Sequence, residues 1–140
     1  ETYSLDDCYW IEKSSTITGM YFITNGTLTL TDGLFNLTST GNSNFYINIP
    51  KTSLPLADFL GKTLTVKCNV TEITGIFLRM SLFYHNGSSW STAVIKDISS
   101  TGLLENSMDV PVDATQIRIR FDLTGTGENT VSFKDFRFLL

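Results

Sequence analysis

In the stretch Thr-Gln-Ile-Arg-Ile-Arg-Phe-Asp-Leu, at positions 115–123, polar and apolar side chains alternate from Gln116 to Leu123. This period of two is typical of a β-strand that has one buried side and one solvent-facing side. The two arginines, Arg118 and Arg120, are therefore predicted to share the open side, where they mark a candidate binding site. The side chains predicted to be buried are those of Ile117, Ile119, Phe121 and Leu123.

Similar short alternating runs recur along the chain, separated by turn residues, and helical periodicity is almost absent. Asn25-Gly26 and Asp32-Gly33 predict hairpins, because both residue types accept a positive φ. Strands are expected at residues 3–10, 20–24, 27–31, 34–38, 44–49, 63–71, 76–85, 90–98, 107–110, 115–123 and 130–139, with one helical turn at 56–60. The pattern predicts an all-β fold in which two antiparallel sheets pack as a sandwich.

The composition limits the domain organisation and the partners. A chain of 140 residues, 41% of them hydrophobic, suits a single domain over residues 1–140. The net charge of -4 repels nucleic acid, so DNA and RNA are not expected as partners. No apolar run approaches the roughly 20 residues that cross a bilayer, so membrane insertion is not expected either. The chain starts at Glu1 without a methionine, which predicts flanking domains in a longer polypeptide.

Catalytic signals are weak. His85 is the only histidine, and no serine or cysteine lies in a nucleophile-elbow motif. The acidic residues fall mainly in predicted turns and at strand ends, where solvated loop charge explains them better than paired glycosidase carboxylates do. The chain is therefore not expected to be an enzyme.

Cys8 and Cys68 are too few for a disulfide framework and lack the spacing of metal ligands. Cys68 shares a predicted face with Leu64, Val66 and Val70, so a buried free thiol and a Cys8–Cys68 bridge both remain open. Four glycosylation sequons, at Asn25, Asn36, Asn69 and Asn86, stay undecided because a chain rich in Thr, Ser and Asn produces them by chance. The abundance of these small polar residues favours an extracellular setting.

The alternation in three further strands predicts which side chains join Arg118 and Arg120. In residues 76–85 the even positions Ile76, Leu78, Met80, Leu82 and Tyr84 are assigned to the core, which leaves Phe77, Arg79, Ser81, Phe83 and His85 outside. In residues 44–49 the same test buries Phe45, Ile47 and Ile49 and exposes Asn44, Tyr46 and Asn48. In the less regular run 90–98 it buries Ala93 and Ile95 and exposes Trp90, Thr92 and Lys96.

The predicted open face combines aromatic rings with guanidinium groups, and this combination suits a sugar. The apolar C–H face of a pyranose stacks on an aromatic ring, and its hydroxyls pair with forked donors such as arginine. The competing interpretation is that these aromatics are covered by a second hydrophobic layer or by a loop. The candidate ligand-binding residues are Tyr46, Arg79, Phe83, Trp90, Arg118 and Arg120.

A succession of segments gives the chain a recognisable order. A Gly-Lys-Thr-Leu-Thr-Val-Lys strand at 61–67 follows the helical turn, and then come an aliphatic-aromatic strand at 76–84, a Trp-led strand at 90–98 and a proline-containing approach at 108–111. The alternating strand, a Gly-Thr-Gly turn at 125–127 and a closing strand with Asp135 complete the series. This order resembles the jelly-roll carbohydrate-binding modules of the galactose-binding-domain-like group.

The resemblance implies a jelly-roll β-sandwich whose ligand lies across one sheet. It also implies a structural calcium ion between the first and last strands, for which Asp135, Asp6 and Asp7 are the candidate ligands. Many relatives have paired acids where this chain has Lys134-Asp135, so a salt-bridged Asp135 is the alternative.

These observations together predict a non-catalytic carbohydrate-binding module that tethers a larger secreted, surface or phage protein to a poly- or oligosaccharide. The alternative is a structural or protein-interaction β-sandwich, such as a spacer or a virion accessory module, that binds no sugar.

Overall fold

A computed structural model describes residues 2–4, 11–13, 16–18, 25–49 and 56–140. The strands are β1 (Thr2–Ser4), β2 (Ile11–Lys13), β3 (Thr16–Thr18), β4 (Gly26–Thr31), β5 (Leu34–Thr40), β6 (Ser43–Ile49), β7 (Thr63–Ile73), β8 (Phe77–His85), β9 (Val94–Ile98), β10 (Gly102–Asp109), β11 (Gln116–Thr124) and β12 (Glu128–Leu139).

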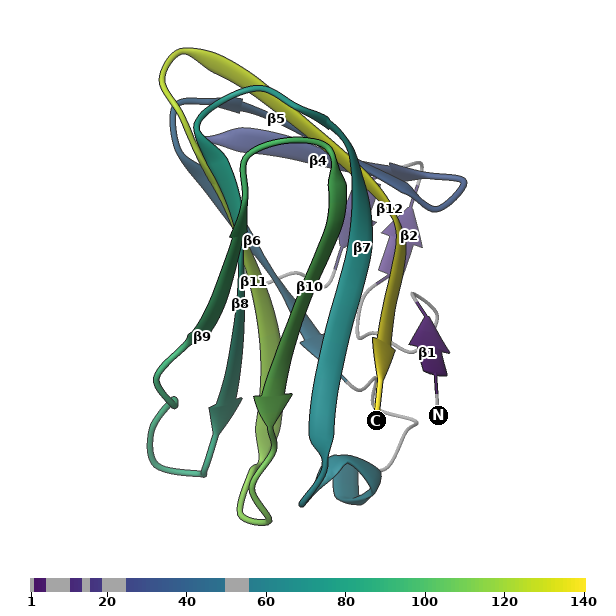
Figure 1. The fold of residues 1–140 in the computed structure, drawn as a ribbon, viewed down its shortest axis with the longest axis vertical. Coiled ribbons are helices and arrows are strands. Elements are labelled where there is room, and N and C mark those ends of the chain that lie inside the picture. Colours follow the sequence, from purple (N-terminus) through teal and green to yellow (C-terminus); the bar gives the residue numbers. More distant parts are fainter. Residues whose placement is uncertain (1, 5–10, 14–15, 19–24, 50–55) are drawn as a thin grey trace.

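The strands form two antiparallel sheets (Figure 1). One sheet has eight strands in the order β10-β7-β12-β5-β4-β3-β2, with β1 paired to β12, and the other has four in the order β6-β11-β8-β9. The predicted all-β sandwich is confirmed.

The chain passes repeatedly from one sheet to the other, as in a jelly roll. From β5 onward it changes sheet at every connection except the one between β8 and β9. A 3₁₀ turn over Leu56–Phe59 precedes β7 and buries Phe59, which confirms the expected helical turn. Among the described residues, no helix has the length and apolar character needed to cross a bilayer.

Stacked phenylalanine rings connect the two sheets through the core. Phe121 of β11 lies 5.1 Å from Phe45 of β6 and 4.9 Å from Phe133 of β12, measured between ring centroids. Phe133 in turn stacks on Phe35 of β5 at 4.6 Å. All four residues have no exposed surface, so these offset ring contacts add to the area that they bury.

The predicted central core is confirmed. Nine side chains expected to pack together all have 0% exposure: Leu64, Val66, Leu78, Met80, Leu82, Ile117, Ile119, Phe121 and Leu123. The assignment of Ile76 to the core is wrong, because this residue is 61% exposed and precedes β8 in the connection from β7. Tyr84, at the other end of β8, is half-buried against the core.

Two irregularities in strand pairing change which residues of β7 and β12 face the core. Between Lys134 and Arg137, β12 carries one more residue than β7, and Asp135 there has a φ of 55°. The extra residue switches the buried positions from odd, ending at Phe133, to even, starting at Phe136. A second register shift lies between Ser132 and Phe133, where β7 carries one more residue than β12. The regular alternation of buried residues in β7 ends there, at Val70.

The Asp32-Gly33 hairpin and the core position of Cys68 are as the sequence predicts. Asp32 and Gly33 have φ values of 50° and 78° and join β4 to β5, which confirms that hairpin. Asn25 also has a positive φ, of 52°, and Gly26 begins β4. The thiol of Cys68 is free and buried, and this burial raises its pKa to about 12. Cys8 and the strand expected at 20–24 lie outside the described residues, and of the strand expected at 3–10 only the start is described, in β1.

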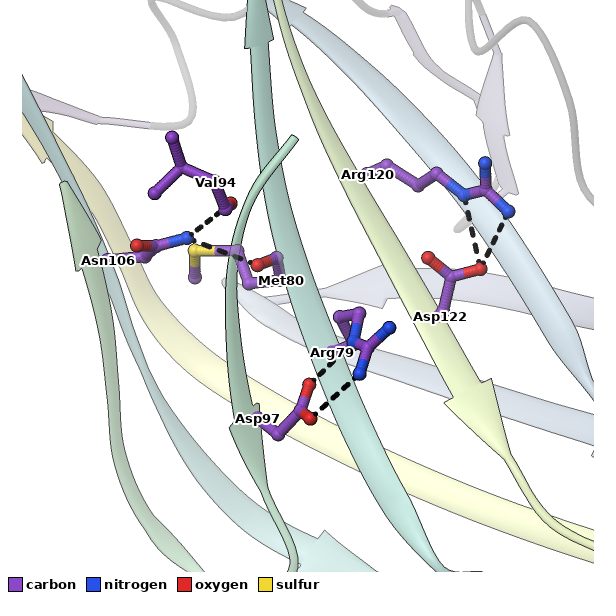
Figure 2. Close-up of polar contacts among 7 residues, drawn as sticks. All are labelled: Arg79, Met80, Val94, Asp97, Asn106, Arg120 and Asp122. Carbon is purple, nitrogen blue, oxygen red and sulfur yellow. Dashed lines mark hydrogen bonds and ion pairs between the residues drawn. The ribbon is translucent and has the colours of Figure 1, made fainter. Parts of the chain in front are cut away.

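A buried amide joins the edges of the two sheets. Asn106 of β10 is 8% exposed, and its Nδ2 donates hydrogen bonds to the carbonyl oxygens of Val94 (2.8 Å) and Met80 (3.2 Å), as Figure 2 shows. Its Oδ1 accepts a hydrogen bond from the backbone N–H of Ser107 at 2.9 Å. One side chain of the eight-stranded sheet thus holds β8 and β9 of the four-stranded sheet.

The ring stack gives a first prediction. Phe121→Ala should lower the free energy of unfolding by roughly 3–5 kcal/mol, because it removes a fully buried ring and leaves a cavity between the sheets. Urea unfolding measures this loss. Val112→Ala, at a residue 78% exposed, is the control and should stay within about 0.5 kcal/mol of wild type. A loss below about 1 kcal/mol for Phe121→Ala would contradict its central position.

The amide gives a second prediction. Asn106→Leu keeps a side chain of similar size but removes the donor, so two carbonyl groups lose their partner, and unfolding should become easier by about 1–3 kcal/mol. The same urea experiment reports the change, with Glu105→Ala, at an exposed residue of the same strand, as the control. Wild-type stability in the Leu variant would show that Asn106 does not hold the sheets together.

Candidate ligand-binding site

The outer face of the four-stranded sheet carries most of the polar and aromatic side chains that the alternation predicted. Two differ: Lys96 pairs with the inward-facing Met80, and Ser81 is buried at 3% exposure. Strand β11 lies inside this sheet, between β6 and β8. Its side chains Ile117, Ile119 and Phe121 are buried, so the intervening residues face outward. Arg118 lies opposite Phe83 of β8 in the register, and Arg120 lies opposite Tyr46 of β6. Antiparallel pairing therefore places side chains from three strands in adjacent rows.

Two neighbouring hollows follow these rows. The first, of about 210 Å³, is lined by Tyr46, Phe83, Trp90, Arg118 and Arg120. The second, of about 300 Å³, is lined by Phe77, Arg79, Ser81, Phe83, Ala93, Ile95, Arg120, Asp122 and Thr124. Phe83 and Arg120 belong to both hollows, so we treat the two as one groove. All six predicted ligand-binding side chains line the groove, although their role in binding stays a prediction.

Arginine–aspartate ion pairs organise the larger hollow (Figure 2). Arg79 of β8 makes a two-point contact with Asp97 of β9, with Nε–Oδ1 at 2.8 Å and Nη2–Oδ2 at 3.0 Å. Arg120 donates through Nε (3.1 Å) and Nη2 (2.9 Å) to one oxygen of Asp122. The hydrogen bonds to Asp97 raise the pKa of the Arg79 guanidinium above its ordinary value. Both guanidinium groups are thus oriented while their side chains remain about one-third exposed.

Guanidinium groups and aromatic rings are in contact in the smaller hollow. The Cζ atom of Arg118 lies 4.2 Å from the ring centroid of Trp90 and 4.8 Å from that of Tyr46. The Cζ atom of Arg120 lies 5.6 Å from the same Tyr46 centroid. These distances are those of cation–π contacts, in which the positive charge meets the electron-rich face of a ring.

Trp90 owes its position to the tight loop between β8 and β9. It forms an isolated β-bridge with His85, and its ring meets the His85 ring edge-on at 4.9 Å and the Phe83 ring edge-on at 6.5 Å. Within the loop, Asn86 Oδ1 accepts hydrogen bonds from the backbone N–H groups of Ser88 and Ser89 at 2.9 and 3.0 Å. The loop therefore holds the indole at the end of the groove by its own hydrogen bonds.

The assignment of Ile95 to the core is wrong. Ile95 is 49% exposed and lines the groove, because it pairs with Ser81, which is only 3% exposed but lies on the groove side of β8 and also lines the groove. Ala93 was likewise expected in the core and lines the groove. The strand itself starts at Val94, four residues later than predicted. The alternation was ambiguous here because Val94 and Ile95 are adjacent apolar residues. Ile95 and Asp97 are two residues apart and so share one side of the strand, and the acidic Asp97 was the signal that this side faces the groove.

Comparisons with known proteins identify the fold. No protein-family model matches the chain, and no curated protein matches it in sequence. Among solved structures, the module TmCBM61 in complex with β-1,4-galactotriose superimposes with a TM-score of 0.57 at 10% identity, over 99% of this chain and 98% of that one. The N-terminal cellulose-binding domain of Cellulomonas fimi β-1,4-glucanase C gives 0.54 at 14% identity, over 83% and 84%.

Larger proteins contain the same fold. The enzymatically active domain of the bacteriophage CBA120 tailspike protein 4 matches with a TM-score of 0.58 at 11% identity. The match covers 83% of this chain but only 17% of the tailspike chain. The chain therefore has the jelly-roll fold found in carbohydrate-binding modules, and the same fold forms a small part of the longer tailspike chain.

Of the three expected calcium ligands, Asp135 lies among the described residues. Asp135 lies at the bulge in β12, and its Oδ2 accepts a hydrogen bond from Nδ2 of Asn69 at 3.0 Å. Asp6 and Asp7 lie outside the described residues, and within these no group of three acidic, histidine or cysteine side chains could hold a metal ion. Calcium takes six to eight oxygen ligands, so Asp135 and Asn69 would supply only the start of a site. The calcium ion stays a prediction.

Its test is thermal unfolding with added calcium and with chelator. If calcium binds the folded chain, chelator should lower the melting temperature, because a ligand that binds only the native state stabilises it. Asp135→Ala should abolish that sensitivity, whereas Asp113→Ala, at an exposed acid in a distant turn, should keep it. Identical melting curves for the calcium-loaded and chelated wild-type protein would contradict a stabilising ion.

Proposed function

We propose that the chain is a non-catalytic carbohydrate-binding module and that its groove is the sugar site. The observation that carries this proposal is the lining of the groove, in which the rings of Tyr46, Phe83 and Trp90 lie beside three guanidinium groups. Rings offer platforms for the C–H faces of pyranoses, and guanidinium groups offer paired donors to adjacent hydroxyls.

The shape of the groove supports the same proposal. It crosses β6, β11 and β8 on an open sheet face and extends to residues of β9 and of the loop before it. The hollows of about 210 and 300 Å³ are joined, which suits several linked sugar units better than one small molecule enclosed on all sides. Structures of the same fold include one solved with a galactotriose and one described as cellulose-binding, so this sandwich is compatible with glycan recognition.

The arrangement of acidic groups supports binding rather than catalysis. Asp122 lines the groove and Asp97 pairs with the groove residue Arg79, so both carboxylates accept hydrogen bonds from arginines. A glycoside hydrolase needs one carboxylic acid that carries a proton for the leaving group. His85 is also engaged, because its Nδ1 accepts a hydrogen bond from the Gly87 N–H at 2.9 Å.

As a module of this kind, the chain would act by tethering. It would hold a neighbouring domain close to an extracellular polysaccharide and so raise the local concentration of that domain on its target. The small part of the tailspike chain that the fold occupies illustrates how such a sandwich is carried within a longer polypeptide.

A glycan array followed by titration calorimetry tests the proposal. Trp90→Ala and Tyr46→Ala should each weaken binding about 10-fold or more, because each removes a ring from the smaller hollow. Leu103→Ala is the matched control: Leu103 is 56% exposed on the outer face of the other sheet, and its removal should leave binding unchanged. Circular dichroism should show that all three variants are folded.

Two outcomes would contradict the proposal. A folded wild-type protein that binds no glycan would favour the structural or protein-interaction module. Glycan binding that survives both ring substitutions would place the sugar site elsewhere on the molecule.

A further inference from the structure

The smaller hollow of the groove differs from the larger one in charge. Its described lining residues are three aromatic and two arginine side chains, with no acidic residue among them. The larger hollow contains Arg79 and Arg120 together with Asp122, and Arg79 is also paired with Asp97. Among the described lining residues, the acidic side chains therefore lie in and beside the larger hollow, and the smaller hollow holds Arg118 among aromatic rings.

Guanidinium groups already contact the Trp90 and Tyr46 rings of the smaller hollow, whereas no such contact is seen for the Phe83 ring among the described residues. Arg118 lies over both the Trp90 and the Tyr46 rings, and Arg120 approaches the Tyr46 ring as well. A neutral sugar that stacked on these same faces would have to displace a guanidinium and lose its cation–π contacts. A stacked guanidinium, however, keeps its N–H donors in the plane of the group, away from the ring faces.

These contacts favour an anion over a neutral hydroxyl at this position. A guanidinium carries five N–H donors, so an incoming carboxylate or sulfate can bind Arg118 in addition to the partners that it already has. Hydrogen bonds between guanidinium and oxyanion are roughly twice as strong as neutral ones. The rings would remain in contact with the cation and would exclude water from the ion pair.

We propose that the groove recognises an acidic saccharide, whose carboxylate or sulfate group binds Arg118 and Arg120 in the smaller hollow while neutral units occupy the larger hollow. This inference rests on the proposed sugar-binding function and adds the chemical class of the ligand. In this inference Arg118 binds the anion, and the Tyr46 and Trp90 rings hold its guanidinium group in position.

The experiment compares matched pairs of polysaccharides. Polygalacturonate is paired with its carboxyl-reduced form and carrageenan with its desulfated form, on an array that also holds neutral glucans, xylans and galactans. Removal of the acidic group should weaken binding about 10- to 100-fold. The pair that shows the loss tells whether the anion is a carboxylate or a sulfate. Raising the salt from about 0.05 to about 0.5 M should also weaken binding, and this arm needs no variant.

Variants of Arg118 locate the effect. Arg118→Met should remove the preference for the acidic member of the pair, and Arg118→Lys, which keeps the charge but not the fork, should restore part of it. Arg137→Met, at an arginine of β12 in the other sheet, is the matched control and should bind as wild type does. Melting temperatures of the three variants check that they are folded.

The outcomes separate the two proposals. Equal binding of the acidic and neutralised members, or an unchanged acidic preference in Arg118→Met, overturns the acidic-saccharide inference and leaves the sugar-binding proposal standing. The absence of binding to every glycan on the array overturns the proposed function and this inference with it.

Discussion

The contact on which the rest of the structure depends is the stacking of Phe121 between Phe45 and Phe133. Phe45 and Phe121 come from the four-stranded sheet and Phe133 from the eight-stranded sheet, so one continuous stack spans the sandwich. The inward position of Phe121 also fixes the orientation of β11, because side chains alternate along a strand. A shift by one residue would bury Arg120 and Asp122 and expose the phenylalanine, at a cost of several kcal/mol for each buried charge. The register of β11 therefore determines both which of its side chains enter the core and which line the groove.

The same constraint explains the bulge in β12. That strand pairs with β5 over its first half and with β1 at its end, while it pairs with β7 across a register shift. Phe133 and Phe136 both have to reach the core, although they are three residues apart and would point to opposite sides of a regular strand. Asp135, with its positive φ, absorbs the extra residue, and Phe136 packs at 6.5 Å from Phe121. Asp and Asn accept this conformation more readily than most residues do.

Alternation in the sequence predicted the central strands and the groove face well, and the physical reason is burial. Strands β8 and β11 each have a neighbour on both edges and a fully covered inner side, so each inward position is apolar. Edge strand β9 is different, because none of its side chains is fully buried and its burial pattern leaves no clear inner side. The alternation there gave the wrong face for Ile95. Strand neighbours could not be predicted in the same way, since the pairing of Arg79 with Asp97 depends on which strands lie side by side.

The ion pairs of the groove are better explained by positioning than by stability. Exposed ion pairs contribute only about 0.2–1 kcal/mol to folding, and both the Arg79–Asp97 and the Arg120–Asp122 pairs are partly exposed. An unrestrained arginine, by contrast, loses about 2 kcal/mol of side-chain entropy when a ligand fixes it. Asp97 and Asp122 have already fixed two guanidinium groups in the folded chain, and the rings of Tyr46 and Trp90 restrict a third. A ligand that enters the groove therefore meets donors that are already oriented, so more of its contact energy is available for affinity.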